Sequence, residues 1–102
     1  MCGIMAYIGK KQAYPILLDG LKKLEYRGYD SSGFAVMNGS LSLLKKEGNV
    51  TALEQYAMDK KTDGNIGLGH TRWATHGVPS DLNSHPHQSQ SGRLTIVHNG
   101  II

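Results

Sequence analysis

Residues 2–9 form a continuous apolar run in which polar and apolar positions do not alternate. This pattern is typical of a β-strand that is buried on both faces. From residue 13 onward the apolar positions recur at helical spacing, at Ala13, Ile16, Leu17, Gly20, Leu21 and Leu24. We therefore predict an amphipathic helix over about residues 13–26, with Pro15 in its first turn and Gly28 placed to stop it.

A hairpin is predicted for residues 33–48, because two β-prone runs flank Asn38-Gly39, a strong signal for a two-residue turn. A short helix is expected to follow it. Thr51 and Glu54 have the spacing of a capping box, and they open a segment that runs to about Asp59.

Two further strands are predicted in the last third of the chain. Residues 65–74 form a glycine-rich strand that leads into a long polar loop, residues 76–93, and residues 93–100 form the last strand. The order strand, helix, hairpin, helix, strand, loop, strand indicates an α+β fold around at least one sheet, within one small domain.

Composition and charge narrow the class of protein. The 102 residues carry a net charge of +3, and the basic residues fall in separated pairs that are usually solvated surface, so nucleic-acid binding is not expected. A single cysteine excludes a scaffold of internal disulfides, and no stretch has the pattern of a signal peptide or a membrane span. We expect a cytoplasmic protein without membrane association. The apolar end of the chain indicates a cut within a longer polypeptide.

Cys2, directly after the initiator methionine, is the first candidate for chemistry. Methionine is removed in cells when the next residue is small, and the mature chain would then begin with a thiol beside a free α-amine. Such an amine is a base poised near neutrality, and an N-terminal amine that activates its own side chain is an established design of nucleophile. From position alone, a small buried hydrophobe is the commoner role for such a cysteine.

Two polar segments could bind a ligand. Residues 25–33 place Arg27 and Asp30 around a glycine, which a helix cap and a surface ion pair would also explain. Residues 69–77 crowd four side chains at a strand-to-loop junction: Arg72, Trp73, Thr75 and His76. An arginine can bind a carboxylate through two parallel hydrogen bonds, which suits an amino-acid ligand. The tryptophan can wall that pocket or belong to the core.

His85 and His87 flank a proline and raise the question of a metal site. Zinc needs a third and a fourth ligand, and no carboxylate or second thiol is spaced with the remaining histidines, His70, His76 and His98. We therefore expect no metal, and loop histidines that hold the loop through hydrogen bonds. Asn99-Gly100 is either a turn or an oxyanion hole, in which a side-chain amide and a glycine N–H point at one oxygen.

Four stretches taken together resemble the N-terminal glutaminase domain of the glutamine–fructose-6-phosphate aminotransferases, which are N-terminal-nucleophile (Ntn) glutamine amidotransferases. These are residues 2–9, 21–33, 69–87 and 97–102, and the hairpin tip and residues 49–64 match weakly. The resemblance implies a four-layer α/β/β/α sandwich, no cofactor, and a homo-oligomeric parent enzyme. It also implies that residues 2–102 are the first part of the glutaminase domain, with the remainder and the sugar-isomerase domains beyond Ile102.

The same resemblance implies a role for each candidate residue. Cys2 attacks the side-chain amide of L-glutamine, and Asn99 and Gly100 hold the oxyanion. Arg72 binds the α-carboxylate of glutamine, and the others shape or support the pocket: Trp73, Thr75, His76 and Arg27. Ammonia would reach fructose 6-phosphate on the missing domains. The alternative is an inactive fragment or a glutamine-binding remnant, which a retained Met1 would favour, as would labelling by 6-diazo-5-oxo-norleucine that survives Cys2→Ala.

Overall fold

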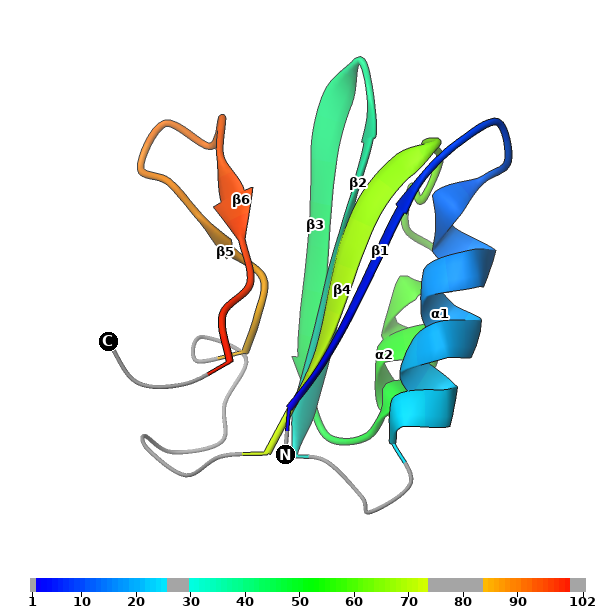
Figure 1. Ribbon diagram of the computed structural model, residues 1–102, viewed down its shortest axis with the longest axis vertical. Coiled ribbons are helices and arrows are strands. Elements are labelled where there is room, and N and C mark those ends of the chain that lie inside the picture. Colours follow the sequence, from blue (N-terminus) through cyan, green and yellow to red (C-terminus); the bar gives the residue numbers. More distant parts are fainter. Residues whose placement is uncertain (1, 26–29, 74–83, 100–102) are drawn as a thin grey trace.

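The computed structural model describes residues 2–25, 30–73 and 84–99, and within them it places two helices on one face of an antiparallel sheet. The sheet has the order β1-β4-β2-β3 and consists of β1 (Gly3–Ile8), β2 (Ser31–Asn38), β3 (Ser40–Glu47) and β4 (Ile66–Arg72). Helices α1 (Ala13–Leu24) and α2 (Val50–Ala57) cover one face. A second, two-stranded sheet, β5 (His87–Gln88) with β6 (Thr95–Ile96), lies across the other face (Figure 1).

The hydrophobic core lies between the four-stranded sheet and the two helices. Leu17 and Leu21 of α1 are fully buried against Phe34 and the rest of the core cluster. Glycines in β4 allow this close packing: a Cβ on Gly67 would lie 2.8 Å from Leu17 Cδ1. The periodic apolar face that predicted the first helix is therefore the face that it buries, and the prediction of that helix is confirmed.

The hairpin is confirmed, but its turn differs from the one that Asn38-Gly39 predicts. Strands β2 and β3 pair from Ser31↔Glu47 to Asn38↔Ser40. Gly39 has a positive φ of 75°, whereas no residue other than glycine has a positive φ in the described part of the chain. A type I′ turn needs a positive φ at both central residues. The glycine alone therefore supplies the left-handed backbone of this turn.

The start of α2 corrects the predicted capping box. The helix begins at Val50, and its cap is Asn49, whose side chain accepts a hydrogen bond from the Ala52 N–H at 2.9 Å. The carboxylate of Glu25 accepts a second hydrogen bond, from the Val50 N–H. Asparagine is as good a helix cap as threonine, and Asn49 lies two residues before Thr51, the predicted cap. Glu25 also ties the end of α1 to the start of α2.

The burial of the first strand and the length of the last strand differ from the predictions. β1 is an edge strand with one covered face, so its side chains alternate in burial, and Ile4 and Ile8 are 44% and 78% exposed. The helices cover only the face that carries Met5 and Tyr7. The last strand is confirmed in place but is two residues long, and the predicted polar loop contains its partner β5.

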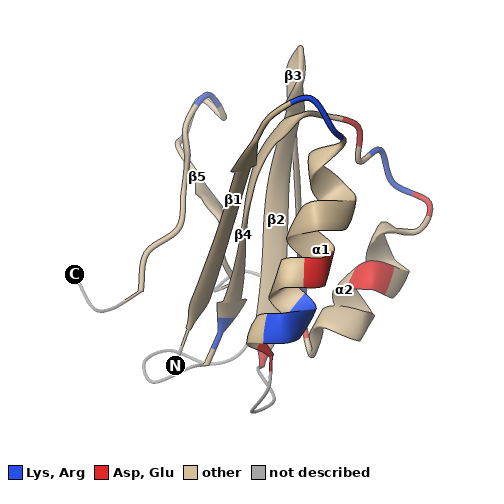
Figure 2. Ribbon diagram, turned by 45° about the vertical axis from the view of Figure 1, so that its right-hand side comes forward, with Lys and Arg blue, Asp and Glu red and all other residues tan. Residues whose placement is uncertain are grey.

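Charged residues of the helical layer lie on its outer surface, where several form ion pairs (Figure 2). Lys22 contacts Glu54 at 2.8 Å, and Lys23 contacts Asp19 one helical turn away at 3.1 Å. Both lysines of the basic pair in α1 thus have an acidic partner on the solvent-exposed surface. Among the described residues, neither helix has the length and the apolar character that crossing a membrane requires.

Candidate active site

Cys2 lies where β1 begins, beside the end of β4. Its Sγ is 3.4 Å from the backbone N of Trp73, which donates to it, and 3.9 Å from the Trp73 carbonyl oxygen. The side chain is half-buried, and it is the free cysteine of the chain. The N-terminal thiol is therefore held by the backbone of the residue that follows β4, and it stays accessible to a reactant.

The strand pairing fixes this position. Gly3 pairs with Thr71, and its N–H donates to Thr71 Oγ1 at 3.2 Å. A Cβ at Gly3 would come within 2.9 Å of both Thr71 Oγ1 and Leu24 Cδ1. The glycine therefore lets the start of β1 lie close to the end of β4, and that closeness brings the thiol to Trp73.

Asn99 reaches Cys2 from the opposite end of the chain. Its Nδ2 donates to the Cys2 carbonyl oxygen at 3.0 Å, and its Oδ1 lies 2.7 Å from Nε2 of His70. His70 is a fully buried residue of β4. The Asn99 carboxamide therefore connects Cys2, which is 97 residues away in the sequence, with His70 of the sheet, which is 29 residues away.

Three histidine rings pack in a row on the sheet face that the helices leave free. The ring centroids of His70 and His85 are 4.3 Å apart, and those of His85 and His87 are 4.4 Å apart. Gly33, which pairs with His70 across the sheet, makes room for this row, because a Cβ there would lie 2.1 Å from the His85 carbonyl oxygen. The Ser84 carbonyl accepts from Lys45 Nζ at 3.0 Å. The segment 84–87 is thus docked on the sheet.

Burial and nearby positive charges disfavour the protonated form of all three histidines. Burial and then the neighbouring positive charges lower the pKa of His87, and burial also lowers that of His70 against the raising effect of its bond to Asn99. The pKa of His85 is lowered to about 4, first by burial and then by the charges of its neighbours, His70, His87, Arg72 and Lys45. Arg72 contributes to all three shifts, so its charge lies near the row.

This depressed pKa predicts that His85 makes stability depend on pH. The unfolded chain takes up a proton on His85 near pH 6.5, whereas the folded chain resists it until about pH 4. The contribution of the neutral His85 ring to the free energy of unfolding is therefore fully present above pH 6.5, and it is lost as the pH falls toward 4. We expect about 1–2 kcal/mol of this loss from His85, after discounting for partial solvent exposure. Denaturant unfolding at several pH values should show it, and an equal slope in His85→Gln would contradict the assignment.

Known proteins match the chain along its whole length, although no model of a protein family does. It is 59% identical over 103 residues to the glutamine–fructose-6-phosphate aminotransferase (isomerizing) of Caldanaerobacter subterraneus. The identity to the enzyme of the same name is 56% in Chlorobaculum tepidum and 55% in Bacteroides thetaiotaomicron. The chain spans 17% of the length of each of these relatives.

Over the segment that it covers, the chain belongs to the glutamine–fructose-6-phosphate aminotransferase family.

A solved structure supports the fold of this family member. The glutamine phosphoribosylpyrophosphate amidotransferase of B. subtilis, complexed with ADP and GMP, superposes with a TM-score of 0.72 at 28% identity. The match covers 88% of this chain and 19% of that chain. That protein is an Ntn-type glutamine amidotransferase, so the α+β class and the relation to the Ntn hydrolases, both expected from the sequence, are confirmed.

The structure brings four of the sequence-predicted site residues of this family member to one end of β1 and β4. Cys2 and Asn99 are hydrogen-bonded, and Trp73 holds the thiol through its backbone while its side chain is 48% exposed. Arg72 is buried at the end of β4, directly after Thr71, which pairs with Gly3 at the start of β1. The other predicted site residues lie outside the described residues: Arg27, Thr75, His76 and Gly100.

His70 is a site residue that the sequence motifs do not identify, because the sequence presents it only as a possible metal ligand. Its position two residues before Arg72 on a strand was a usable signal, since side chains at i and i+2 share a face. In the described part of the chain no group of three potential ligands could hold a metal ion. Of the loop histidines, His85 packs with a tilt on His70 of β4 and makes an edge-on contact with His87, and His85 Nδ1 has no hydrogen-bond partner among the described residues.

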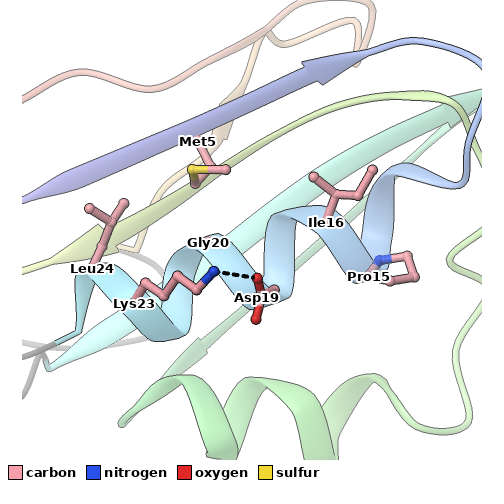
Figure 3. Close-up of a pocket in the computed structure, with 7 residues that line it drawn as sticks. All are labelled: Met5, Pro15, Ile16, Asp19, Gly20, Lys23 and Leu24. Atoms are coloured by element: carbon pink, nitrogen blue, oxygen red, sulfur yellow. Dashed lines mark ion pairs between the residues drawn. The ribbon is translucent and has the colours of Figure 1, made fainter.

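A groove of about 460 Å³ lies between α1 and β1. Figure 3 shows Met5 of β1 above Gly20, with Leu24, Ile16 and Pro15 along α1 and the Asp19–Lys23 ion pair at the rim. Its lining is mostly apolar, and it lies on the helical side of the sheet, away from the row of histidines. Its lining contains no thiol, hydroxyl or imidazole side chain, whereas the site described above contains the Cys2 thiol.

Proposed function

We propose that this chain forms the nucleophile-bearing part of a site that hydrolyses L-glutamine to glutamate and ammonia. The hydrogen bond from Asn99 Nδ2 to the Cys2 carbonyl carries the proposal, because it brings an amide donor beside an accessible thiol. A nucleophile with a donor for the developing oxyanion is the minimal machinery of acyl transfer. The names of the relatives supply glutamine as the substrate.

The proposed reaction has two steps. After removal of Met1, the α-amine of Cys2 takes the thiol proton, and Sγ attacks the side-chain amide carbon of glutamine. The oxygen of the tetrahedral intermediate accepts hydrogen bonds from Asn99 Nδ2 and the Gly100 N–H. The C–N bond then breaks, and the amine returns the proton to the departing ammonia. Water attacks the thioester with help from the same amine, and the C–S bond breaks to release glutamate.

Recognition of the substrate is assigned to the end of β4 and to nearby residues. Arg72 binds the α-carboxylate in this proposal, and further residues shape or support the pocket: Trp73, Thr75, His76 and Arg27. Arg72 lowers the pKa of His70 and of His85, so its positive charge lies near the row of histidines. A positive charge at this place supports the proposed role of Arg72. A guanidinium suits a carboxylate through paired hydrogen bonds.

Arg72→Ala is expected to raise the KM for glutamine about 10- to 100-fold, the cost of a charge-assisted hydrogen-bond pair, with a smaller change in kcat. Arg72→Lys keeps the charge but loses the planar fork, so we expect an intermediate KM. Steady-state glutaminase assays on the full-length protein measure both constants. An unchanged KM in Arg72→Ala would remove this residue from the glutamine pocket.

We further propose that residues 2–102 are the first portion of a glutaminase domain whose other parts cover the free sheet face. That face carries exposed apolar side chains beyond the reach of β5 and β6: Ile4, Ile8, Met37 and Ile66. Contiguous exposed apolar surface of this kind marks an interface. In the full protein the ammonia would aminate fructose 6-phosphate on further domains, as the names of the relatives indicate.

A further inference from the structure

We propose that His70 is the positioning residue of the oxyanion-binding amide: its Nε2–H orients the Asn99 carboxamide so that the amide nitrogen faces the reacting carbonyl. This inference rests on the proposed glutaminase function, and it assigns to a buried histidine of β4 a role that the sequence motifs did not reveal. His70 itself does not touch the substrate in this proposal.

The first step concerns the proton on the imidazole. Nε2 of His70 lies 2.7 Å from Oδ1 of Asn99, and a carboxamide oxygen can only accept hydrogen bonds. The proton must therefore be on Nε2. Nδ1 has no hydrogen-bond partner within the described part of the chain, and burial favours the neutral ring. His70 is thus a neutral donor with its single N–H directed at Asn99.

The second step concerns the orientation of the carboxamide. With Oδ1 on His70, Nδ2 points toward Cys2, donates to its carbonyl oxygen at 3.0 Å, and keeps a second hydrogen for an oxyanion. A flipped amide would set Nδ2 against the His70 N–H and Oδ1 against the Cys2 carbonyl. Both contacts would then be repulsive. His70 and the Cys2 carbonyl together exclude the orientation that could not stabilise an oxyanion.

The third step concerns rigidity, since a positioning residue has to be fixed itself. His70 is fully buried, and its backbone is paired on both sides, with Ile4 of β1 and Gly33 of β2. The His85 ring stacks on it at 4.3 Å with a tilt of 32°. Side-chain donors that are held before the reaction cost no reorganisation when charge develops.

The test uses the full-length protein and compares variants that remove or keep the donor. His70→Leu removes the N–H, and His70→Phe removes it while keeping a ring against His85. Both are expected to lower kcat for glutamine hydrolysis about 10- to 100-fold with little change in KM, because the donor is still present but wrongly oriented. His70→Gln, which can again donate to Oδ1, should restore kcat to within about threefold of wild type.

A double-mutant cycle with Asn99→Ala separates positioning from general damage. If His70 acts through Asn99, adding His70→Leu to Asn99→Ala lowers kcat no further, whereas independent roles multiply. Alkylation of Cys2 by iodoacetamide needs no oxyanion donor, so its rate should be unchanged in the single His70 variants. His87→Gln is the matched control within the histidine row and should keep the kcat of wild type.

Each outcome decides between the two proposals. A wild-type protein without glutaminase activity overturns the proposed function itself. An active wild type with multiplicative effects in the cycle, or with His70→Leu and His70→Phe as active as wild type, overturns the role of His70 alone. His70→Gln decides the question if neither His70→Leu nor His70→Phe folds. Its side-chain amide should replace the imidazole N–H as donor, so a folded His70→Gln protein with kcat lowered 10-fold or more also overturns the role of His70.

Discussion

Replacing Cys2 by alanine is expected to abolish glutamine hydrolysis, with kcat reduced about 10⁴-fold or more, because the nucleophile and the thioester intermediate are both lost. A residue inserted before Cys2 should be nearly as damaging, since the α-amine then becomes an amide and no longer accepts the thiol proton. The measurement is glutamate release by the full-length protein, with mass spectrometry to determine its first residue.

The single cysteine makes this experiment easy to control within the segment. Cys2 is the one cysteine among the 102 residues, so labelling of this segment by 6-diazo-5-oxo-norleucine should disappear with Cys2→Ala. Folding can be checked independently, because the Cys2 side chain contributes little to the core in its half-buried position. Full turnover in material that still carries Met1 would contradict the proposed mechanism.

Asn99→Ala is expected to lower kcat about 10²- to 10³-fold, the usual cost of removing one oxyanion donor, with a small change in KM. The variant Asn99→Asp should lose as much. Its carboxylate can still accept from His70 at Oδ1, but it has no N–H to offer to the Cys2 carbonyl or to the oxyanion.

The control for Asn99 is Asn65→Ala, an exposed asparagine at the far end of β4, which should keep the activity of wild type. The assay is steady-state glutamine hydrolysis with kcat and KM determined separately. If Asn99→Ala raised KM and left kcat unchanged, Asn99 would be a ground-state binding residue and the oxyanion assignment would fail.

Local patterns in the sequence were sufficient to predict most elements of the fold. The helical spacing of apolar residues located α1, and Asn38-Gly39 located the hairpin, because both signals act within a few residues. The burial of β1 was predicted incorrectly. A strand that is apolar throughout is typical of a doubly covered sheet, and the pattern does not reveal which segments supply the cover.

The candidate site was predicted only in part, because local sequence patterns do not show which distant segments come into contact. Motifs nominated Cys2, Arg72 and Asn99, but the contact between the two ends of the chain depends on the pairing of β1 with β4 and on the placement of the segment after β6. The role of His70 becomes visible only through its 2.7 Å contact with Asn99, since nothing in the order of residues links positions 70 and 99.

Hydrogen bonds of Glu25 and Asp30 connect α1, α2 and the end of β4. Glu25 binds the first turn of α2, while the Asp30 N–H donates to the Arg72 carbonyl at 3.0 Å and its own carbonyl accepts from Gly48 at 2.7 Å. Arg27 lies between these two anchored residues in the sequence. A displacement at the start of α2 would therefore be transmitted through Glu25 to the end of α1, and through Gly48 and Asp30 to the backbone of Arg72, the residue proposed to bind glutamine.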